Sequence, residues 1–179
     1  MSTTTQEKAP ATQRETFVAA MSRDTRGTEL ERLAAVLDTI LAWSAKRPGL
    51  VTTRGAERSS DALHFTREGA KVALWSIRAP RGGAPTLEVS PATVRSLDAD
   101  TRARACATLT THSRAAQVEG DRMRIGLAAL KNPAALTAIM ALLEEVLTAA
   151  ERAAAPQPPT AAAAPAPAAA PTAPERVDA

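Results

Sequence analysis

The stretch Lys71–Arg78, K-V-A-L-W-S-I-R, is the part of the sequence richest in strand-forming side chains. Successive side chains of an extended chain point to opposite faces, so Val72 and Leu74 share one face. The other face carries Trp75 and Ile77, and aromatic and β-branched residues of this kind favour strands. A strand that is apolar on both faces is typical of the middle of a sheet that other elements cover. We therefore expect this strand to be the structural centre of a small sheet.

The residues before this strand predict its hairpin partner. Apolar and polar side chains alternate over 61–66, and Gly69 supplies the positive φ of a turn. A loop of two or four residues would pair Phe65 with Val72, whereas a three-residue loop with a bulge would pair His64 with Val72. We prefer the first register because it sets apolar residues opposite apolar residues.

Further strands and helices are predicted on both sides of this hairpin. The strands lie at 50–53, 86–89 and 122–127, and the helices at 28–47, 98–112 and 133–150. The last helix has the strongest start signal, since Asn132 is a good N-cap and Pro133 suits the first helical position. The first helix begins with the capping-box pattern Thr28–Glu31. The predicted fold class is α+β: a small antiparallel sheet of four or five strands packed by long N- and C-terminal helices, with disordered tails.

Composition divides the chain into three parts. Residues 1–26 are polar and are predicted to be a disordered N-terminal tail, apart from the apolar patch Phe17–Met21. That patch either docks on the domain as a short helix or binds a partner, and docking is preferred because such patches beside a domain commonly cover it. Residues 27–152 are predicted to form a single α+β domain. Residues 153–179 are predicted to be an Ala/Pro-rich disordered tail, because the repeated prolines forbid a helix.

Composition also argues against several classes of protein. The formal net charge is only +3, and Cys106 is the single cysteine. One cysteine allows neither an intramolecular disulfide framework nor a multi-cysteine zinc site. The N-terminus lacks the apolar segment of a secretory signal, and no run of about 18 apolar residues would span a membrane. We expect a cytoplasmic protein that engages no membrane and holds no cofactor.

A catalytic site would have to be built from scattered side chains. His64 has no second metal ligand at an HExxH, CxxC or HxH spacing. Cys106 and His112 lie on one predicted helix at a separation that prevents them from meeting as a nucleophile–base pair. We therefore expect a non-catalytic protein, and an enzyme with a site near Asp61, His64 and Cys106 is kept as an alternative.

Four arginines are candidates for contacts with nucleic acid or another anion. Arg78 and Arg81 follow the central strand, while Arg122 and Arg124 point outward from the last strand. On one sheet face they would form a patch able to contact phosphates. Nearby glutamates would weaken that patch, and both tryptophans are expected in the core rather than stacked on bases. A nucleic-acid-binding accessory factor that uses this arginine-bearing face is therefore a further alternative.

The apolar stripe of the last helix, at 136–150, also bears on function. It is long and regular enough to pair across a two-fold axis, although packing on the sheet is the preferred interpretation. The sequence favours a non-catalytic cytoplasmic interaction or accessory protein that self-associates or binds a protein partner. The identity of that partner does not follow from any motif in the chain.

Overall fold

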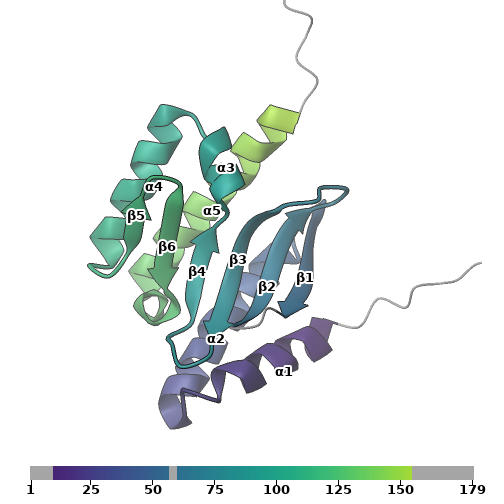
Figure 1. Ribbon diagram of the computed structural model, residues 1–179, viewed down its shortest axis with the longest axis vertical. Helices are drawn as coiled ribbons and strands as arrows, with labels where there is room; N and C mark the ends of the chain where they lie inside the picture. The colour runs from purple at the N-terminus through teal and green to yellow at the C-terminus, as the bar shows by residue number, and fades with distance from the viewer. Residues whose placement is uncertain (1–9, 57–59, 155–179) are drawn as a thin grey trace, which may run out of the picture.

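The computed structural model describes residues 10–56 and 60–154, and Figure 1 shows the arrangement of its helices and strands. The helices are α1 (Pro10–Met21), α2 (Gly27–Ser44), α3 (Pro91–Ser96), α4 (Ala99–His112) and α5 (Pro133–Ala154), with a 3-10 helix η1 (Leu127–Lys131). The strands are β1 (Leu50–Ala56), β2 (Ser60–Arg67), β3 (Ala73–Pro80), β4 (Thr86–Val89), β5 (Gln117–Glu119) and β6 (Arg122–Gly126). They form one antiparallel sheet in the order β1-β2-β3-β4-β6-β5. The predicted α+β class is confirmed.

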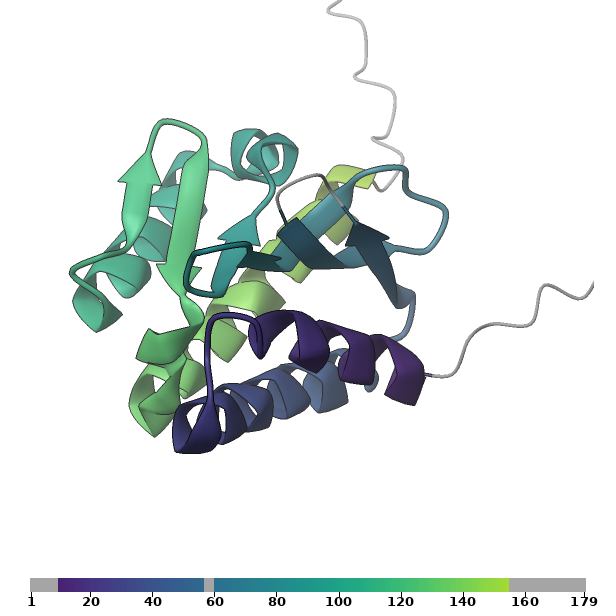
Figure 2. The ribbon, with the colours of Figure 1, turned by 60° about the horizontal axis from the view of Figure 1, so that its bottom comes forward.

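The helices lie on one face of this sheet and leave the other face open. In Figure 1 the strands lie in front of α2 and α5, and α4 lies behind β5. Figure 2 shows α1 and α2 side by side across the lower end of the sheet. None of the described elements covers the front face. The sheet is therefore two-sided, with one face in the core and one in solvent.

The core is centred on β3, as the sequence predicts. Trp75 and Ile77 are fully buried on the helix-covered face. The Trp75 ring stacks on Phe65 with centroids 5.6 Å apart and meets Trp43 of α2 at 6.0 Å. Offset aromatic pairs at such distances add about 0.5–1.5 kcal/mol beyond the area that they bury. Three of the four aromatic side chains thus lie in one cluster that joins the sheet to α2.

The predicted hairpin register is wrong. Phe65 lies opposite Trp75, and a bulge follows, so that Thr66 lies opposite Ala73. Val72 precedes the strand and is 54% exposed. Trp75 has far more apolar surface to remove from water than Val72, so the register that turns the indole toward the helices is the more stable one.

The sheet has six strands rather than the predicted four or five. The additional strand, β5, contains only three residues, and Val118 is its single apolar side chain. Three residues are too few to show the alternation of apolar and polar side chains by which a strand is recognised in a sequence. Gly120, with φ of 58°, forms the turn to β6, where the predicted outward arginines and the buried Met123 are found.

Helix α1 lies within the segment predicted as an N-terminal tail. Phe17 is fully buried and Met21 is 2% exposed, and both belong to the main hydrophobic cluster. Polar contacts fix the helix at both ends: Arg14 donates to Asp38 of α2, and Arg23, just after α1, forms an ion pair with Asp61 of β2. The docked alternative for the apolar patch is therefore the one that the structure shows, and a helix that packs on the domain lies before residue 27.

Side-chain caps mark the starts of α4 and α5. The Asp98 side chain accepts a hydrogen bond from the Thr101 amide at 2.8 Å, at the predicted start of α4. Asn132 does the same for Ala134 at 2.9 Å and precedes Pro133, which confirms the predicted start of α5. Helix α2 begins one residue before the predicted capping box and has no side-chain cap, so that motif is not used.

Helix α5 has the length and composition of a membrane span but is packed as a core helix. Over Pro133–Ala153 the mean hydropathy is 1.5, and among the described residues no other helix meets the same criterion. Its apolar stripe is nevertheless in the core, with Ile139, Leu143 and Val146 fully buried. The helix ends at Ala154, so most of the predicted tail at 153–179 lies outside the described residues.

Candidate functional site

The open face of the sheet carries an unbroken polar row that runs across the strands. The row contains one residue from each strand, and each of these residues pairs directly with the row residue of the neighbouring strand. In strand order these residues are Thr53, His64, Ser76, Glu88, Arg124 and Gln117. Side chains in one cross-strand row share a face, so the row places hydroxyl, imidazole, carboxylate, guanidinium and amide groups on the open face, with Ser76 only 6% exposed at its centre.

A second row beside it is built mostly from small residues and makes room for Arg78. Its members are Gly55, Ala62, Arg78, Thr86 and Gly126. The Arg78 Nε lies 3.4 Å from a carboxylate oxygen of Glu88 on the neighbouring strand. Both side chains are partly buried, with 31% and 22% of their surfaces exposed. This ion pair is therefore better shielded from water than most surface pairs.

His64 lies directly on Gly55. A Cβ atom built on Gly55 would come within 2.4 Å of the His64 Nε2 atom. Cβ atoms essentially never approach another heavy atom this closely, so the absence of a Cβ at Gly55 leaves the space over β1 that the imidazole occupies. The glycine thereby fixes where the imidazole sits on the open face.

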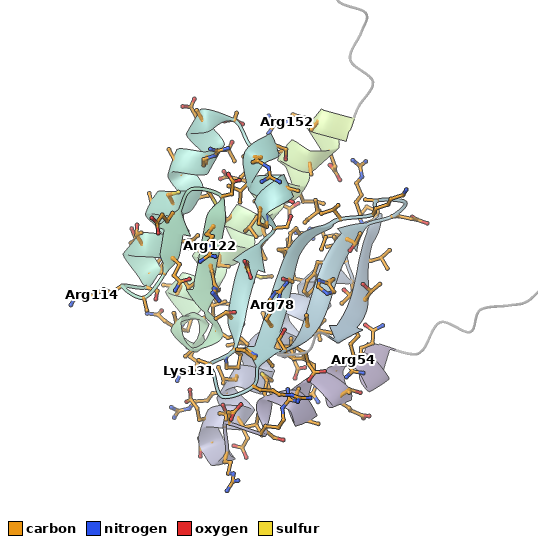
Figure 3. All side chains as sticks on the ribbon, in the orientation of Figure 1. Arg54, Arg78, Arg114, Arg122, Lys131 and Arg152 are labelled. Carbon is orange, nitrogen blue, oxygen red and sulfur yellow. The ribbon has the colours of Figure 1, made fainter. Side chains whose placement is uncertain are left out.

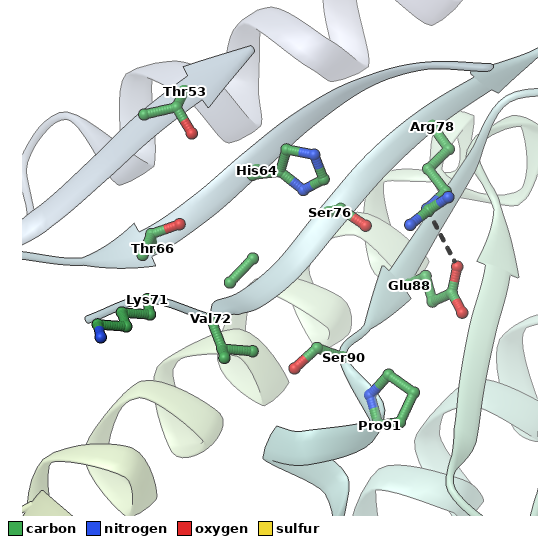
Figure 4. Close-up of a pocket in the computed structure, with 11 residues that line it drawn as sticks. Thr53, His64, Thr66, Lys71, Val72, Ser76, Arg78, Glu88, Ser90 and Pro91 are labelled. Atoms are coloured by element: carbon green, nitrogen blue, oxygen red, sulfur yellow. Dashed lines mark ion pairs between the residues drawn. The ribbon is translucent and has the colours of Figure 1, made fainter. Parts of the chain in front are cut away.

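Two adjoining hollows occupy the end of this face that lies near the β2–β3 loop. The larger has a volume of about 410 Å³ and contains His64, Ser76 and the Arg78–Glu88 pair, as Figure 4 shows. The smaller, of about 320 Å³, is lined by β1, the end of β2 and the loop. Thr53, Thr66 and Lys71 line both hollows, which makes them one continuous surface.

The rim of this surface is apolar. Val51 is 36% exposed and Val72 is 54% exposed, and among the described residues these are the exposed large hydrophobic side chains. Val51 lines the smaller hollow and Val72 the larger one. Isolated apolar side chains on a surface are ordinary, but two beside a shared hollow are typical of a contact surface. We call the two hollows with this rim the open-face patch.

The structure brings three of the four predicted arginines onto the open face. Arg78 lies on β3, and Arg122 and Arg124 lie on β6; Figure 3 labels Arg78 and Arg122 on the front of the sheet. Arg81 lies apart from them, exposed in the β3–β4 turn. Carboxylates intervene, as the sequence predicts.

Two glutamates share the face with these arginines. Glu88 lies between Arg78 and Arg124, and Glu119 lies opposite Arg122 in the β5–β6 pair. The positive charge of the face is therefore interrupted rather than continuous. A polyanion would meet alternating signs along this row.

The three residues of the predicted enzyme site are not brought together. Asp61 and His64 are three positions apart on β2 and so point to opposite faces of the sheet. Cys106 lies on α4, partly buried against the hydrophobic cluster behind the sheet. The described residues contain no group of three or more His, Cys, Asp or Glu side chains placed to hold a metal ion.

Asp61 has a structural role at the lower end of the sheet. Its carboxylate accepts hydrogen bonds from Arg23 at 2.7 Å and from Arg54 at 2.9 Å. Burial acts to raise the pKa of Asp61, but the hydrogen bonds and charges of the two guanidinium groups outweigh it and hold the pKa below its ordinary value. An acid that is so firmly ionised and doubly paired is unsuited to proton transfer near neutral pH.

Sequence reasoning missed the hydroxyl groups and the valine rim of the open-face patch. The missed lining residues are Val51, Thr53, Thr66, Lys71, Val72, Ser76 and Ser90. The alternation on β2 contained a usable signal, because residues of the same parity as His64 are small or polar. That signal becomes informative only once the neighbouring register is known.

Comparisons with known proteins give no relative for this chain. It matches no protein-family model, no curated protein and no solved structure. Its function therefore has to be argued from the geometry described above.

Proposed function

We propose that this chain is a non-catalytic, cytoplasmic interaction or accessory protein that binds a protein partner on the open face of its sheet. The observation that carries the proposal is the open-face patch, where exposed Val51 and Val72 flank hollows lined by hydroxyl groups and the Arg78–Glu88 pair. Apolar side chains beside a few hydrogen-bonding groups match the usual composition of a protein interface. The partner would place an apolar side chain between the valines and polar groups over His64 and Ser76.

The arrangement of the chemical groups supports binding more than catalysis. The hollow is wide and shallow, and the charged groups within it, Arg78 and Glu88, neutralise one another. Asp61 and Cys106 lie on other surfaces. A general base needs to lie within hydrogen-bond reach of the proton it takes, and neither of the groups predicted to act with His64 lies on its face of the sheet.

Site-specific photo-crosslinking in native lysate tests the proposal. The photoreactive amino acid p-benzoylphenylalanine is placed at Val72 in the patch and, as a matched control, at Ala42, which is exposed on α2 on the other side of the molecule. We expect a discrete protein adduct from position 72 that is absent from position 42. The adduct should disappear when Val51→Glu is introduced beside the crosslinker.

The possible outcomes distinguish specific binding from non-specific labelling. Equal adducts from both positions would show non-specific labelling, and no adduct from position 72 would overturn the proposed surface. Val51→Glu lies on an exposed edge and should change the free energy of unfolding by less than about 0.5 kcal/mol. A loss of the adduct with an unchanged denaturation midpoint therefore reports on binding rather than on folding.

A second candidate is a nucleic-acid-binding accessory factor. The observation in its favour is that Arg78, Arg122 and Arg124 share the open face, and the exposed Arg81 could extend their reach. Interposed Glu88 and Glu119 weigh against it. Fluorescence anisotropy with mixed-sequence RNA and duplex DNA decides, since phosphate contacts predict an affinity that falls steeply with salt. An anisotropy that stays flat at low salt would remove this candidate.

A further inference from the structure

Strand β1 forms a free edge of the sheet over its whole length. It pairs with β2 on one side, and in Figures 1 and 2 no described element lies beyond it on the other. The opposite edge strand, β5, has only three residues against the seven of β1. Long exposed edges are rare in isolated chains because their unpaired backbone groups are a template for another strand.

The direction of the backbone groups of β1 follows from one hydrogen bond. The Glu68 amide donates to the Gly49 carbonyl at 2.7 Å, which makes this a hydrogen-bonded pair of the β1–β2 ladder. Hydrogen-bonded and non-bonded pairs alternate along an antiparallel ladder. The residues that turn their amide and carbonyl groups away from β2 are therefore Leu50, Thr52, Arg54 and Ala56. Of these donors, the Leu50 amide is already bonded, to the Arg47 carbonyl at 3.3 Å.

Two common devices that protect an edge, proline and lysine, are missing from β1. The sequence of the strand, L-V-T-T-R-G-A, is rich in β-branched residues. Its one charged residue, Arg54, is ion-paired with Asp61 of the same chain at 2.9 Å. The charge that would repel an incoming strand is thereby compensated within the chain.

We propose that two copies of this chain associate through antiparallel pairing of their β1 strands, with Thr53 on the two-fold axis. In this register the outward groups of Thr52 and Arg54 bond to those of Arg54 and Thr52 in the second copy. The free Leu50 carbonyl accepts from Ala56 of that copy. A register centred on Thr52 would leave the Ala56 groups opposite Pro48, which has no amide proton.

Side chains on the open face are complementary in the same register. Val51, which is 36% exposed, comes to lie opposite Gly55 of the second copy, where no Cβ obstructs it and the His64 imidazole offers a covering surface. The axis is perpendicular to the sheet, so the two open faces form one continuous surface. A second copy is favoured over a head-to-tail array because β5 presents only Val118 on its free side, too little for β1 of another copy to pair with.

A charge-exchange experiment on the full chain tests the pairing. Sedimentation velocity of the unaltered protein should show a reversible dimer of twice 18.7 kDa. Thr53→Lys and Thr53→Glu each place like charges on the axis and should weaken the association by up to about fivefold. An equimolar mixture of the two variants should restore the dimer, because opposite charges then meet.

Matched controls distinguish this interface from others. Thr137→Lys, on the exposed face of α5, should leave the dimer unchanged. Thr53→Cys should form a disulfide-linked dimer under mild oxidation, whereas the unaltered chain, whose only cysteine is Cys106, should not. A protein that is monomeric at all concentrations, or a mixture that fails to reassociate, would overturn the proposal.

This association shares Val51 and Thr53 with the proposed partner surface, so the crosslinker at Val72 tests the partner surface and the Thr53 charge exchange tests the pairing. A dimer without a photo-adduct at Val72 would support the β1 pairing and overturn the partner surface. A photo-adduct at Val72 from a protein that stays monomeric would support the partner surface and overturn the β1 pairing. If both hold, each dimer presents two open-face patches on the same side of one sheet.

Discussion

Replacing Gly55 by alanine should have opposite effects on stability depending on whether His64 is present. The new Cβ would lie 2.4 Å from the imidazole Nε2 and 2.9 Å from Cδ2. Ordinary van der Waals contacts are a full ångström longer than the first of these, so the imidazole must leave its position on β1. Gly55 has no left-handed backbone conformation, and alanine fits its strand geometry without strain.

Two terms set the magnitude. Overpacking in a well-packed core typically costs about 1–3 kcal/mol, and we take about 1.5–2 kcal/mol here because the half-buried imidazole can turn partly toward solvent. Alanine in place of a strand glycine gains about 0.5–1 kcal/mol, because it reduces the conformational freedom of the unfolded chain. We therefore expect Gly55→Ala to lower the free energy of unfolding by about 1 kcal/mol in the unaltered background. In the His64→Ala background only the favourable term remains, and the same change should raise stability by about 0.5–1 kcal/mol.

Urea denaturation of the four proteins in this double-mutant cycle measures both effects. Two-state fits with a shared slope give the coupling energy between the two sites, expected at about 1.5–2 kcal/mol. The inference would be refuted if Gly55→Ala had the same sign in both backgrounds. Equal signs would mean that the imidazole moves away at no cost and that Gly55 does not determine its position.

Three further changes test other parts of the structure. Phe17→Ala should cost about 3–5 kcal/mol in urea denaturation, because its ring is fully buried, whereas Glu15→Ala, exposed on the same helix, should cost almost nothing; equal small effects would show that α1 does not contribute to the core. Asp61→Asn should cost about 1 kcal/mol at pH 7. The pKa of Asp61 is depressed in the folded state, so its ion pairs stabilise the fold above the ordinary pKa of 3.8, and this stabilisation is lost as the pH falls through the lower folded-state pKa. The difference in free energy of unfolding between the unaltered protein and Asp61→Asn should therefore shrink below about pH 4. A difference that does not change with pH would contradict the assignment. Val72→Glu should leave the denaturation midpoint unchanged within about 0.5 kcal/mol and abolish the photo-adduct from a crosslinker at Val51, and a retained adduct would exclude Val72 from the contact.

The parts of the fold that could be predicted are those fixed by local chemistry. Asn132 and Pro133 start α5, and Asp98 starts α4, because a side-chain cap satisfies amides that would otherwise lack partners. The alternation at Met123 likewise marked the buried face of β6. Such signals need only a few neighbouring residues and do not depend on tertiary packing.

The parts that could not be predicted depend on contacts distant in sequence. Helix α1 has little amphipathic pattern of its own, and the burial of Phe17 results from the position of the sheet end above it. Strand β5 exists because β6 offers it a partner, although its three residues contain no strand signal. In both cases tertiary context overrides weak local preference.

The candidate site depends on the register between β2 and β3, which decides whether His64 lies on the same face as Trp75 and which the sequence does not determine. With Phe65 opposite Val72, His64 would share a face with Trp75, and the open-face row could not form. With Phe65 opposite Trp75, His64 and Ser76 come to lie opposite one another on the solvent side. Burial of the Trp75 indole selects the second arrangement, so the largest core side chain also determines which polar groups meet on the opposite face. The double-mutant cycle at Gly55 and His64 tests the β1–β2 side of this face, because the imidazole reaches Gly55 only in the register that pairs His64 with Thr53.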